Sequence, residues 1–257
     1  MFSVKDKVIV VTGGGTGIGL ATVKRLLAAE ARVAFCTRSD STELAASLGA
    51  TFVRADVADD DQVKGLMQQV HDELGPIDVL VNNAGSWDLD SPVEGSGESF
   101  RRDFEVNLMG TLSCIRHAAP LMRDGGVIID ISSLAAYIGM PAYGSYNTSK
   151  AAQAALTRTA AIELGDRGIR VIDIAPGTVA TENLAEETDS EAEIEAFNRL
   201  TPLRRVCEMD EVAAVVHFLA SDDCRYITGS AIILDGGLQA GISTGLGELL
   251  LGGGDPS

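Results

Sequence analysis

The sequence predicts an α/β fold, in which one doubly wound parallel sheet of seven strands is covered by helices on both faces. Three observations carry this prediction. Short β-branched and aliphatic runs alternate with longer segments of helical periodicity. These runs are apolar throughout, which is typical of parallel strands buried on both faces. A glycine-rich segment at 13–19 stands between the first such run and the first helical segment, as in a βαβ unit.

The strands are expected in a regular order along the chain. They fall at 7–12, 32–36, 51–53, 77–81, 126–131, 169–174 and 231–234. The main helices are expected at 17–29, 59–74, 100–121, 145–164 and 210–220. In open sheets of this kind, ligands bind beyond the carboxyl ends of the strands. Residues that follow the strands are therefore the first candidates for a site.

Length and composition favour a single domain over 1–257. The chain has 257 residues, of which 46% are hydrophobic, and this is enough for one large core. The acid-rich stretch from 182 to 195 predicts a mobile lid over 182–208, with a solvated surface helix as the alternative. The glycine- and leucine-containing tail at 241–257 is expected either to pack on a neighbouring subunit or to be disordered.

Charge and cysteine usage exclude several classes of partner. The formal net charge of −17 disfavours binding to nucleic acid and to anionic membranes. The four cysteines and three histidines are scattered, so we expect free thiols and no metal site. The apolar run at 8–11 is too short for a secretory signal or a membrane span. The expected location is the cytoplasm.

The glycine-rich segment predicts a phosphate-binding loop. Glycines let the backbone turn tightly and approach a pyrophosphate, and the start of the following helix supplies unpaired N–H groups. The spacing is T-G-x-x-x-G-x-G rather than the commoner G-x-G-x-x-G. The residues expected to bind a dinucleotide here are Gly13, Gly15, Thr16, Gly17, Ile18 and Gly19.

Tyr146 and Lys150 form the most informative pair in the chain. Four positions apart, they share one face of the predicted helix. An ammonium near a phenol favours the ionised phenol, which otherwise titrates near pH ~10. The hydroxyl of Ser133, thirteen residues upstream of Tyr146, could bind a developing alkoxide at the same point.

With these elements the chain resembles the short-chain dehydrogenase/reductase family, in its single-domain branch of roughly 250 residues and with its Rossmann-type sheet. The resemblance runs from residue 7 to about residue 237 and includes N-N-A-G at 82–85, Asn107, P-G-x-x-x-T at 176–181 and D-G-G at 235–237. One departure is Ile172, where many relatives carry asparagine, followed by Asp173.

The resemblance implies an NAD(P)(H)-dependent oxidoreductase that interconverts a ketone or aldehyde and a secondary alcohol. Tyr146 would be the general acid or base, and Lys150 would hold the nicotinamide ribose and depress the tyrosine pKa. Ser133 would bind the substrate oxygen. Asn107 would hold a water that links Lys150 to solvent, with a structural hydrogen bond as the alternative.

The resemblance also assigns the rest of the cofactor site. The expected contacts are Asp56, Val57, Asn83, Ala84, Gly85, Tyr146, Lys150, Pro176, Gly177, Val179 and Thr181. The position after the second strand that is usually acidic is the neutral Thr37, followed by Arg38 and Ser39. A guanidinium there suits a 2′-phosphate, so NADP(H) is preferred and NAD(H) is possible. Nearby Asp40 argues against this preference.

The substrate is expected to be a neutral ketone or alcohol bound by Ser133, Tyr146, Trp87 and Met140, because the surroundings are apolar and the lid is acidic. Two alternatives stay open: a non-catalytic NADP(H)-binding regulator, and another reaction on the same fold, such as epimerisation or dehydration. The family habit implies a homotetramer.

Overall fold

The computed structural model describes residues 2–88, 90–181, 191–241 and 247. Its centre is a parallel sheet of seven strands in the order β3-β2-β1-β4-β5-β6-β7, which confirms the predicted fold class. The strands are β1 Val8–Thr12, β2 Arg32–Thr37, β3 Thr51–Arg54, β4 Ile77–Asn82, β5 Met122–Ile131, β6 Arg170–Pro176 and β7 Ala231–Leu234. The strand order reverses between β1 and β4, so a crevice is expected where their carboxyl ends diverge.

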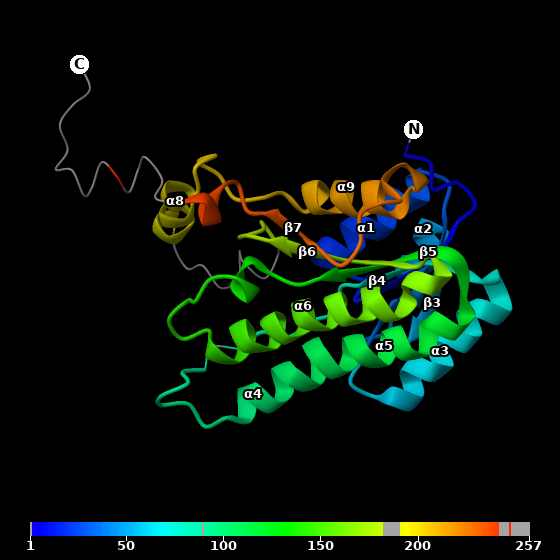
Figure 1. Ribbon diagram of the computed structural model, residues 1–257, viewed down its shortest axis with the longest axis horizontal. Helices are drawn as coiled ribbons and strands as arrows, with labels where there is room; N and C mark the ends of the chain where they lie inside the picture. Colours follow the sequence, from blue (N-terminus) through cyan, green and yellow to red (C-terminus); the bar gives the residue numbers. More distant parts are fainter. Residues whose placement is uncertain (1, 89, 182–190, 242–246, 248–257) are drawn as a thin grey trace, which may run out of the picture.

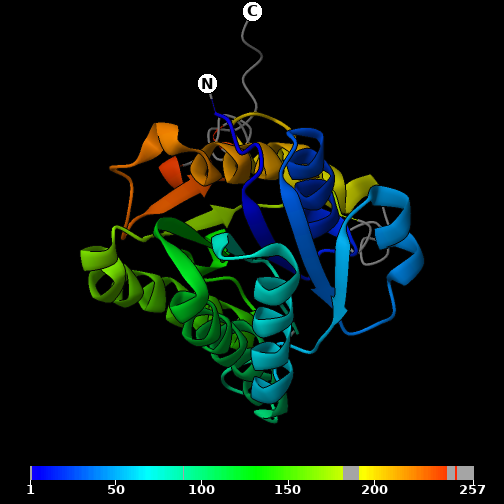
Figure 2. The same ribbon diagram turned by 90° about the vertical axis from the view of Figure 1, so that its right-hand side faces the viewer.

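Helices cover both faces of the sheet (Figure 2). They are α1 Gly17–Ala28, α2 Thr42–Leu48, α3 Asp60–Leu74, α4 Glu98–Asp103, α5 Thr111–Ala118, α6 Gly144–Leu164, α8 Glu191–Leu200 and α9 Met209–Ala220. Helices α1, α2 and α9 pack on one face, and α3, α5 and α6 pack on the other. Helix α8 and the loop before α6 lie on the left of Figure 1, at the opposite side from the N-terminus.

Alternate residues of each strand serve the two faces. In β1, Val8 and Val10 enter the core under α3, α5 and α6, while Ile9 and Val11 enter the core under α1 and α9. This two-residue alternation follows from the pleat. Because both faces are covered, every residue of β1 is buried, which explains the continuous apolar run.

The expected helix at 100–121 is not a single regular α-helix. Between α4 and α5 the chain forms a π-helical segment, Phe104–Gly110, with Asn107 inside it. Thr111 Oγ1 donates to the carbonyl of Asn107 at 2.8 Å. Gly110 faces Val57, and a Cβ there would lie 2.9 Å from Val57 Cγ2. Periodicity alone predicts neither the wider turn nor this contact.

Two further elements differ from the sequence prediction. Helix α2 was not expected, and β5 starts at Met122 rather than 126, because Met122 pairs with Ile77 ahead of a register shift in β4. The predicted lid falls partly outside the described residues, at 182–190, and its described part contains α8. The predicted tail lies outside them except for 241 and 247. Among the described residues, no helix is both long and apolar enough to span a membrane.

Candidate active site

The glycine loop joins β1 to α1 as predicted and leaves no room for larger side chains at its most crowded position. A Cβ at Gly19 would lie 2.1 Å from the carbonyl oxygen of Gly13, and one at Gly14 would lie 2.5 Å from Phe35 Cβ. Gly13 and Gly17 have φ values of +65° and +53°, which favour glycine. The backbone at the start of α1 is thus shaped to approach a phosphate group closely.

The end of β4 braces this loop through a compact set of hydrogen bonds. Thr12 Oγ1 accepts from the backbone N–H groups of Asn83 and Ala84, both at 3.0 Å. Asn83 Nδ2 donates to the carbonyls of Thr12 and Gly13 at 3.0 and 3.1 Å. The predicted cofactor residues of these two strand ends therefore lie together.

Tyr146, Lys150 and Ser133 gather at the same edge of the sheet. Lys150 Nζ lies 5.8 Å from the centre of the Tyr146 ring, and Tyr146 hydrogen-bonds Ser133. Lys150 Nζ donates to Ile131 O at 2.9 Å and to Gln153 Oε1 at 3.0 Å. An ammonium has three N–H groups, so one is left to bind a ligand. Gly85, in the loop after β4, lies close to this lysine: a Cβ added to Gly85 would be 3.5 Å from Lys150 Nζ.

Burial governs the titration of the tyrosine and the lysine. Burial raises the pKa of Tyr146, although the hydrogen bond with Ser133 opposes the rise. This direction is opposite to the depressed pKa expected from the lysine. Burial also lowers the pKa of Lys150 to about 8, against the pull of nearby carboxylates. In the protein by itself, burial is therefore the largest influence on the pKa of each group.

Asn107 is fully buried and its side-chain amide is engaged on both atoms. Its Nδ2 donates to Ser86 O at 2.8 Å and to Ser149 Oγ at 2.9 Å, and its Oδ1 accepts from Ser86 N at 2.8 Å. The amide thus holds the loop after β4 against α6, which agrees with the structural alternative. The water-holding role stays a prediction.

Three buried carboxylates favour the charged form of Lys150, and sequence reasoning did not identify them as site residues. They are Asp103, Asp130 and Asp173, from the end of α4, from β5 and from β6. Burial raises the pKa of Asp130 to about 6 and also raises that of Asp173. The only sequence signal was Asp173 beside Ile172, because a carboxylate within an apolar run predicts an unusual buried charge.

Arg38 and Ser39 are exposed beyond β2, beside the glycine loop. Arg54, which was not predicted, joins them by donating from Nε to Arg38 O at 2.8 Å. Thr37 Oγ1 lies 3.0 Å from Ser41 Oγ, and a Cβ at Gly15 would lie 2.8 Å from Thr37 Cγ2.

Asp40, the residue that argued against a 2′-phosphate, is turned away to α2. Its Oδ1 accepts from both the N–H and the hydroxyl of Thr42, at 3.0 and 2.6 Å. These hydrogen bonds, the hydroxyl first, lower the pKa of Asp40. One oxygen of this carboxylate is therefore engaged by the first residue of α2.

The remaining predicted cofactor residues follow β3 and β6. Asp56 Oδ1 accepts a hydrogen bond from Ala58 N at 3.0 Å, and Val57 is buried against Gly110. Gly177 N donates to Leu234 O at 2.9 Å, which seats the segment containing Pro176, Gly177 and Val179 beside β7. Thr181 Cγ2 lies 3.8 Å from where a Gly17 Cβ would be. The segment after β6 therefore borders the glycine loop, in which Ile18 packs against the core under α1 and α9 and Thr16 is the N-cap of α1.

Trp87, one of the predicted substrate residues, forms an aromatic wall with Tyr143, which stands three residues before Tyr146. The rings of Trp87 and Tyr143 are nearly parallel, with centroids 6.5 Å apart and 17° between planes. Tyr143 N donates to Met140 O at 3.2 Å. Trp87 belongs to the loop after β4, and Met140 and Tyr143 belong to the loop before α6. The two loops therefore meet where Trp87 stacks on Tyr143.

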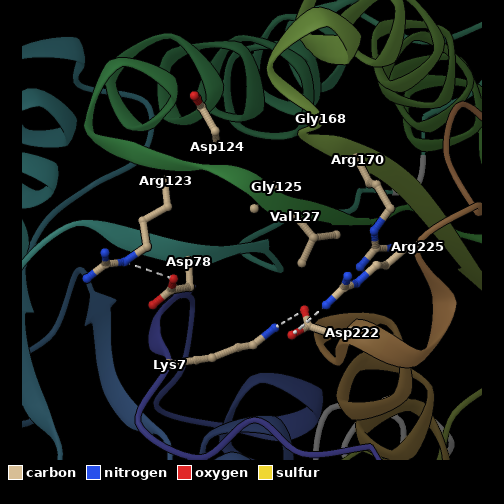
Figure 3. A pocket seen from close by; sticks show the side chains of 11 residues that line it. Lys7, Asp78, Arg123, Asp124, Gly125, Val127, Gly168, Arg170, Asp222 and Arg225 are labelled. Atoms are coloured by element: carbon tan, nitrogen blue, oxygen red, sulfur yellow. Dashed lines mark hydrogen bonds and ion pairs between the residues drawn. The ribbon is translucent and has the colours of Figure 1, made fainter.

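A hollow of about 400 Å³ lies at the opposite, amino-terminal edge of the sheet (Figure 3). Its cations already have partners: Lys7 and Arg225 pair with Asp222 at 2.8 and 3.4 Å, and Arg123 pairs with Asp78 at 3.2 Å. We therefore place the candidate active site at the carboxyl edge. No cluster of histidine, cysteine or acidic side chains suited to a metal ion occurs among the described residues.

Comparison with known proteins finds relatives that match most of the chain. A family model described as Enoyl-(Acyl carrier protein) reductase matches residues 13–239. The 2,5-dichloro-2,5-cyclohexadiene-1,4-diol dehydrogenase of Sphingobium indicum is 37% identical over 249 residues, or 93% of this chain and 100% of that protein. The meso-2,3-butanediol dehydrogenase of Serratia marcescens is 36% identical over 241 residues, or 91% and 95% of the two chains. The structure of ElxO with NADP bound matches with a TM-score of 0.87 and 31% identity, covering 92% of this chain and 100% of that chain.

Proposed function

The chain belongs to the short-chain dehydrogenase/reductase family of oxidoreductases, and from this premise we propose that it reduces a neutral ketone or aldehyde to an alcohol, and catalyses the reverse, with NADP(H) as the preferred cofactor. The observation that carries the proposal is the meeting of Ser133, Tyr146 and Lys150 beside the glycine loop. A protein that only bound the cofactor would need no proton donor there.

In the proposed mechanism the chain binds, orients and transfers protons. The cofactor, when bound across the glycine loop, supplies or accepts a hydride. The Ser133 hydroxyl donates a hydrogen bond to the substrate oxygen as negative charge grows on it. Tyr146 then delivers its proton to that oxygen, and takes it back in the oxidative direction. The remaining N–H of Lys150 would bind a ribose hydroxyl of the cofactor, and the ammonium would hold positive charge beside the phenol.

A panel of neutral ketones and secondary alcohols, followed by NADPH and NADH absorbance, tests the proposal. We expect turnover of at least one carbonyl compound and its loss on Ser133→Ala. Turnover that survives in Ser133→Ala and Tyr146→Phe alike would contradict the assigned site. Cofactor binding without turnover of any compound would favour the regulator instead.

The preference for NADP(H) rests on Arg38 and Arg54, supported by the diversion of Asp40 to Thr42. Charge-assisted hydrogen bonds to a phosphate are among the stronger ones in proteins. The double variant Arg38→Ala/Arg54→Ala is expected to weaken NADPH binding about tenfold or more, with little change for NADH. Arg32→Ala, at the amino end of β2, is the matched control. Equal losses for both cofactors would contradict this assignment.

The substrate class follows from the aromatic wall and from the relatives. Trp87 and Tyr143 offer flat apolar faces beside the tyrosine, which suits a compact or cyclic neutral molecule. Both dehydrogenases described above have names that specify diols. We therefore place neutral diols and cyclic alcohols first in the panel.

We also propose a homotetramer in the cytoplasm. Two large apolar residues are exposed on the helices that cover one face of the sheet: Met109, on the π-helical segment, is 46% accessible, and Ile162, on α6, is 82% accessible. All four cysteines are free thiols and three of them are buried, which suits a reducing compartment. Light scattering in solution measures the assembly; a monomer would refute this proposal.

A further inference from the structure

Lys150 has an unusual environment for a group that must stay charged. Its side chain is only 3% exposed, and burial disfavours the ammonium strongly enough to lower its pKa to about 8. Its two hydrogen-bond acceptors, Ile131 O and Gln153 Oε1, are both neutral. Neutral acceptors compensate a buried charge less well than a carboxylate does. Its positive charge therefore depends on more distant groups.

The sheet places carboxylates below the lysine by register. Asn82, Asp130 and Asp173 are direct partners on β4, β5 and β6, so they lie in one row across the sheet. They share the face that packs under α6, because Leu80, Ile128 and Val171, two residues earlier in each strand, enter the core on that face. Lys150 projects from α6 toward the same edge.

The two strand carboxylates are held differently. Both oxygens of Asp130 are occupied, by Asn82 Nδ2 at 2.8 Å and by Thr157 Oγ1 at 2.7 Å. Asp173 Oδ2 accepts from the Tyr137 hydroxyl at 2.8 Å, and Ser132 beside it, ahead of Tyr137, also favours the ionised carboxylate against the effect of burial. Of the three carboxylates near Lys150, Asp173 opposes the loss of the lysine proton most. Asp103, the third, accepts from Ser86 Oγ at 2.7 Å.

We propose that Asp173 is a positioning residue of the active site: its carboxylate keeps Lys150 in the ammonium form, and the Tyr137 hydroxyl holds that carboxylate in place and charged. The inference rests on the proposed function only in the use made of Lys150 there. The charges that face Lys150 are Asp103 from α4, Asp130 from β5 and Asp173 from β6, with the neutral phenol of Tyr146 one turn away on α6.

The pair also has a defined connection to the surface. Tyr137, in the loop after β5, is partly exposed, and burial, together with its contact with Asp173, raises its pKa well above the ordinary value of a phenol. Tyr137 therefore stays protonated and can only donate to Asp173 over the working pH range. A permanent donor of this kind favours the ionised carboxylate.

The test measures the lysine directly in the cofactor-free full-length chain. The chain has only five lysines, so their ¹³Cε signals can be resolved by NMR, with Lys150→Arg assigning the one of interest. Asp173→Asn is expected to lower the pKa of Lys150 by about one unit. Tyr137→Phe, which keeps the carboxylate, is expected to lower it by less. Asp124→Asn removes the same charge at the other edge of the sheet and is expected to leave it unchanged.

A second readout connects the effect to turnover. The alkaline limb of the kcat/KM profile should move to lower pH by the same amount in Asp173→Asn, and it should not move in Asp124→Asn. An unchanged pKa of Lys150 in both Asp173→Asn and Tyr137→Phe would overturn the inference. If Asp173→Asn does not fold, Tyr137→Phe decides alone. A shifted pKa in a protein without any turnover would support the inference and count against the proposed function.

Discussion

Charged side chains have opposite environments at the two edges of the central sheet. At the amino-terminal edge, Lys7, Arg123 and Arg225 face carboxylates in surface ion pairs (Figure 3). At the carboxyl edge, Lys150 is buried, its direct hydrogen-bond partners are neutral atoms, and the charges of Asp103, Asp130 and Asp173 act on it from a greater distance. At the amino-terminal edge, each positive charge is neutralised by a carboxylate in direct contact and reached by water. At the carboxyl edge, the charge of Lys150 is buried and is compensated only by carboxylates that do not contact it.

The difference teaches where chemistry can reside in this molecule. Exposed pairs are screened by water and contribute little to stability or reactivity. Buried groups with shifted pKa values cost stability but can exchange protons near neutral pH. The following predictions compare the two edges, beginning with the largest expected effect.

Replacement of the proton donor should have the largest effect. Tyr146→Phe is expected to lower kcat by about a thousandfold, because general acid–base catalysis by one side chain contributes about that much. Binding of NADPH, measured by fluorescence titration, should persist. Tyr226→Phe is the matched control, since this tyrosine is fully exposed. Comparable rates in Tyr146→Phe and the native protein would remove the tyrosine from the mechanism.

A methyl group in the glycine loop should have the next largest effect. Gly19→Ala would place Cβ 2.1 Å from the Gly13 carbonyl, so the loop must shift and cofactor affinity should fall at least about tenfold. Gly65→Ala, in α3, is the control, because nothing lies within 4 Å of its added carbon. This control should bind NADPH normally and unfold at a slightly higher temperature, since alanine favours helix. Unchanged affinity in Gly19→Ala would refute the close approach.

The pH dependence of stability should have opposite signs at the two edges. The folded-state pKa of Asp130, about 6, lies above its unfolded value near ~3.9. Its ionisation therefore costs stability above pH ~6, and the cost disappears as the pH falls toward ~4. The free energy of unfolding of Asp130→Asn, minus that of the native protein, should be larger at pH 8 than at pH 4 by on the order of 2 kcal/mol, as measured by urea unfolding at both pH values.

Asp222 at the other edge supplies the opposing case. A hydrogen bond from Lys7, the largest cause, lowers the pKa of Asp222, so its stabilising contribution is present at neutral pH and lost as the pH falls below its unfolded value. Asp222→Asn should therefore be less stable than the native protein at pH 7, with the difference vanishing in acid. The same sign of pH dependence in both variants would contradict the contrast between the edges.

The smallest effect is expected from the amino-terminal edge alone. Arg225 is largely exposed, and its ion pair with Asp222 is 3.4 Å long. Arg225→Ala should change kcat/KM by less than about twofold and leave the melting temperature nearly unchanged. A loss of activity of tenfold or more would show that the amino-terminal edge is coupled to the active site, and would contradict its exclusion from the reaction.

Much of this architecture could be predicted from the sequence, because its signals are local. The apolar runs identify strands, and the glycines of 13–19 identify a turn with no room for side chains. Tyr146 and Lys150 are four residues apart on one helix, so their proximity needs no knowledge of the sheet. These features are confirmed because each depends on residues close together in the chain.

Other features depend on which strands become neighbours, and the sequence hides them. Asp130 and Asp173 are forty-three positions apart, and only the pairing of β5 with β6 makes them adjacent. Arg54 reaches Arg38 through the pairing of β2 with β3. The raised pKa of Tyr146 was missed for a similar reason, because burial is a property of the packed molecule.

Strand β6 places alternate residues in different environments, and this restricts how the protein can change during evolution. Ile172 and Ile174 enter the core under α9, while Asp173 points to the lysine side of the sheet. Substitutions within the strand can alter one face and spare the other. A single-residue insertion or deletion between Arg170 and Pro176 would exchange the faces, placing a carboxylate in the hydrophobic core and an isoleucine beside the lysine. Variation in length should therefore be tolerated in the loops on either side of β6, and excluded from the strand itself.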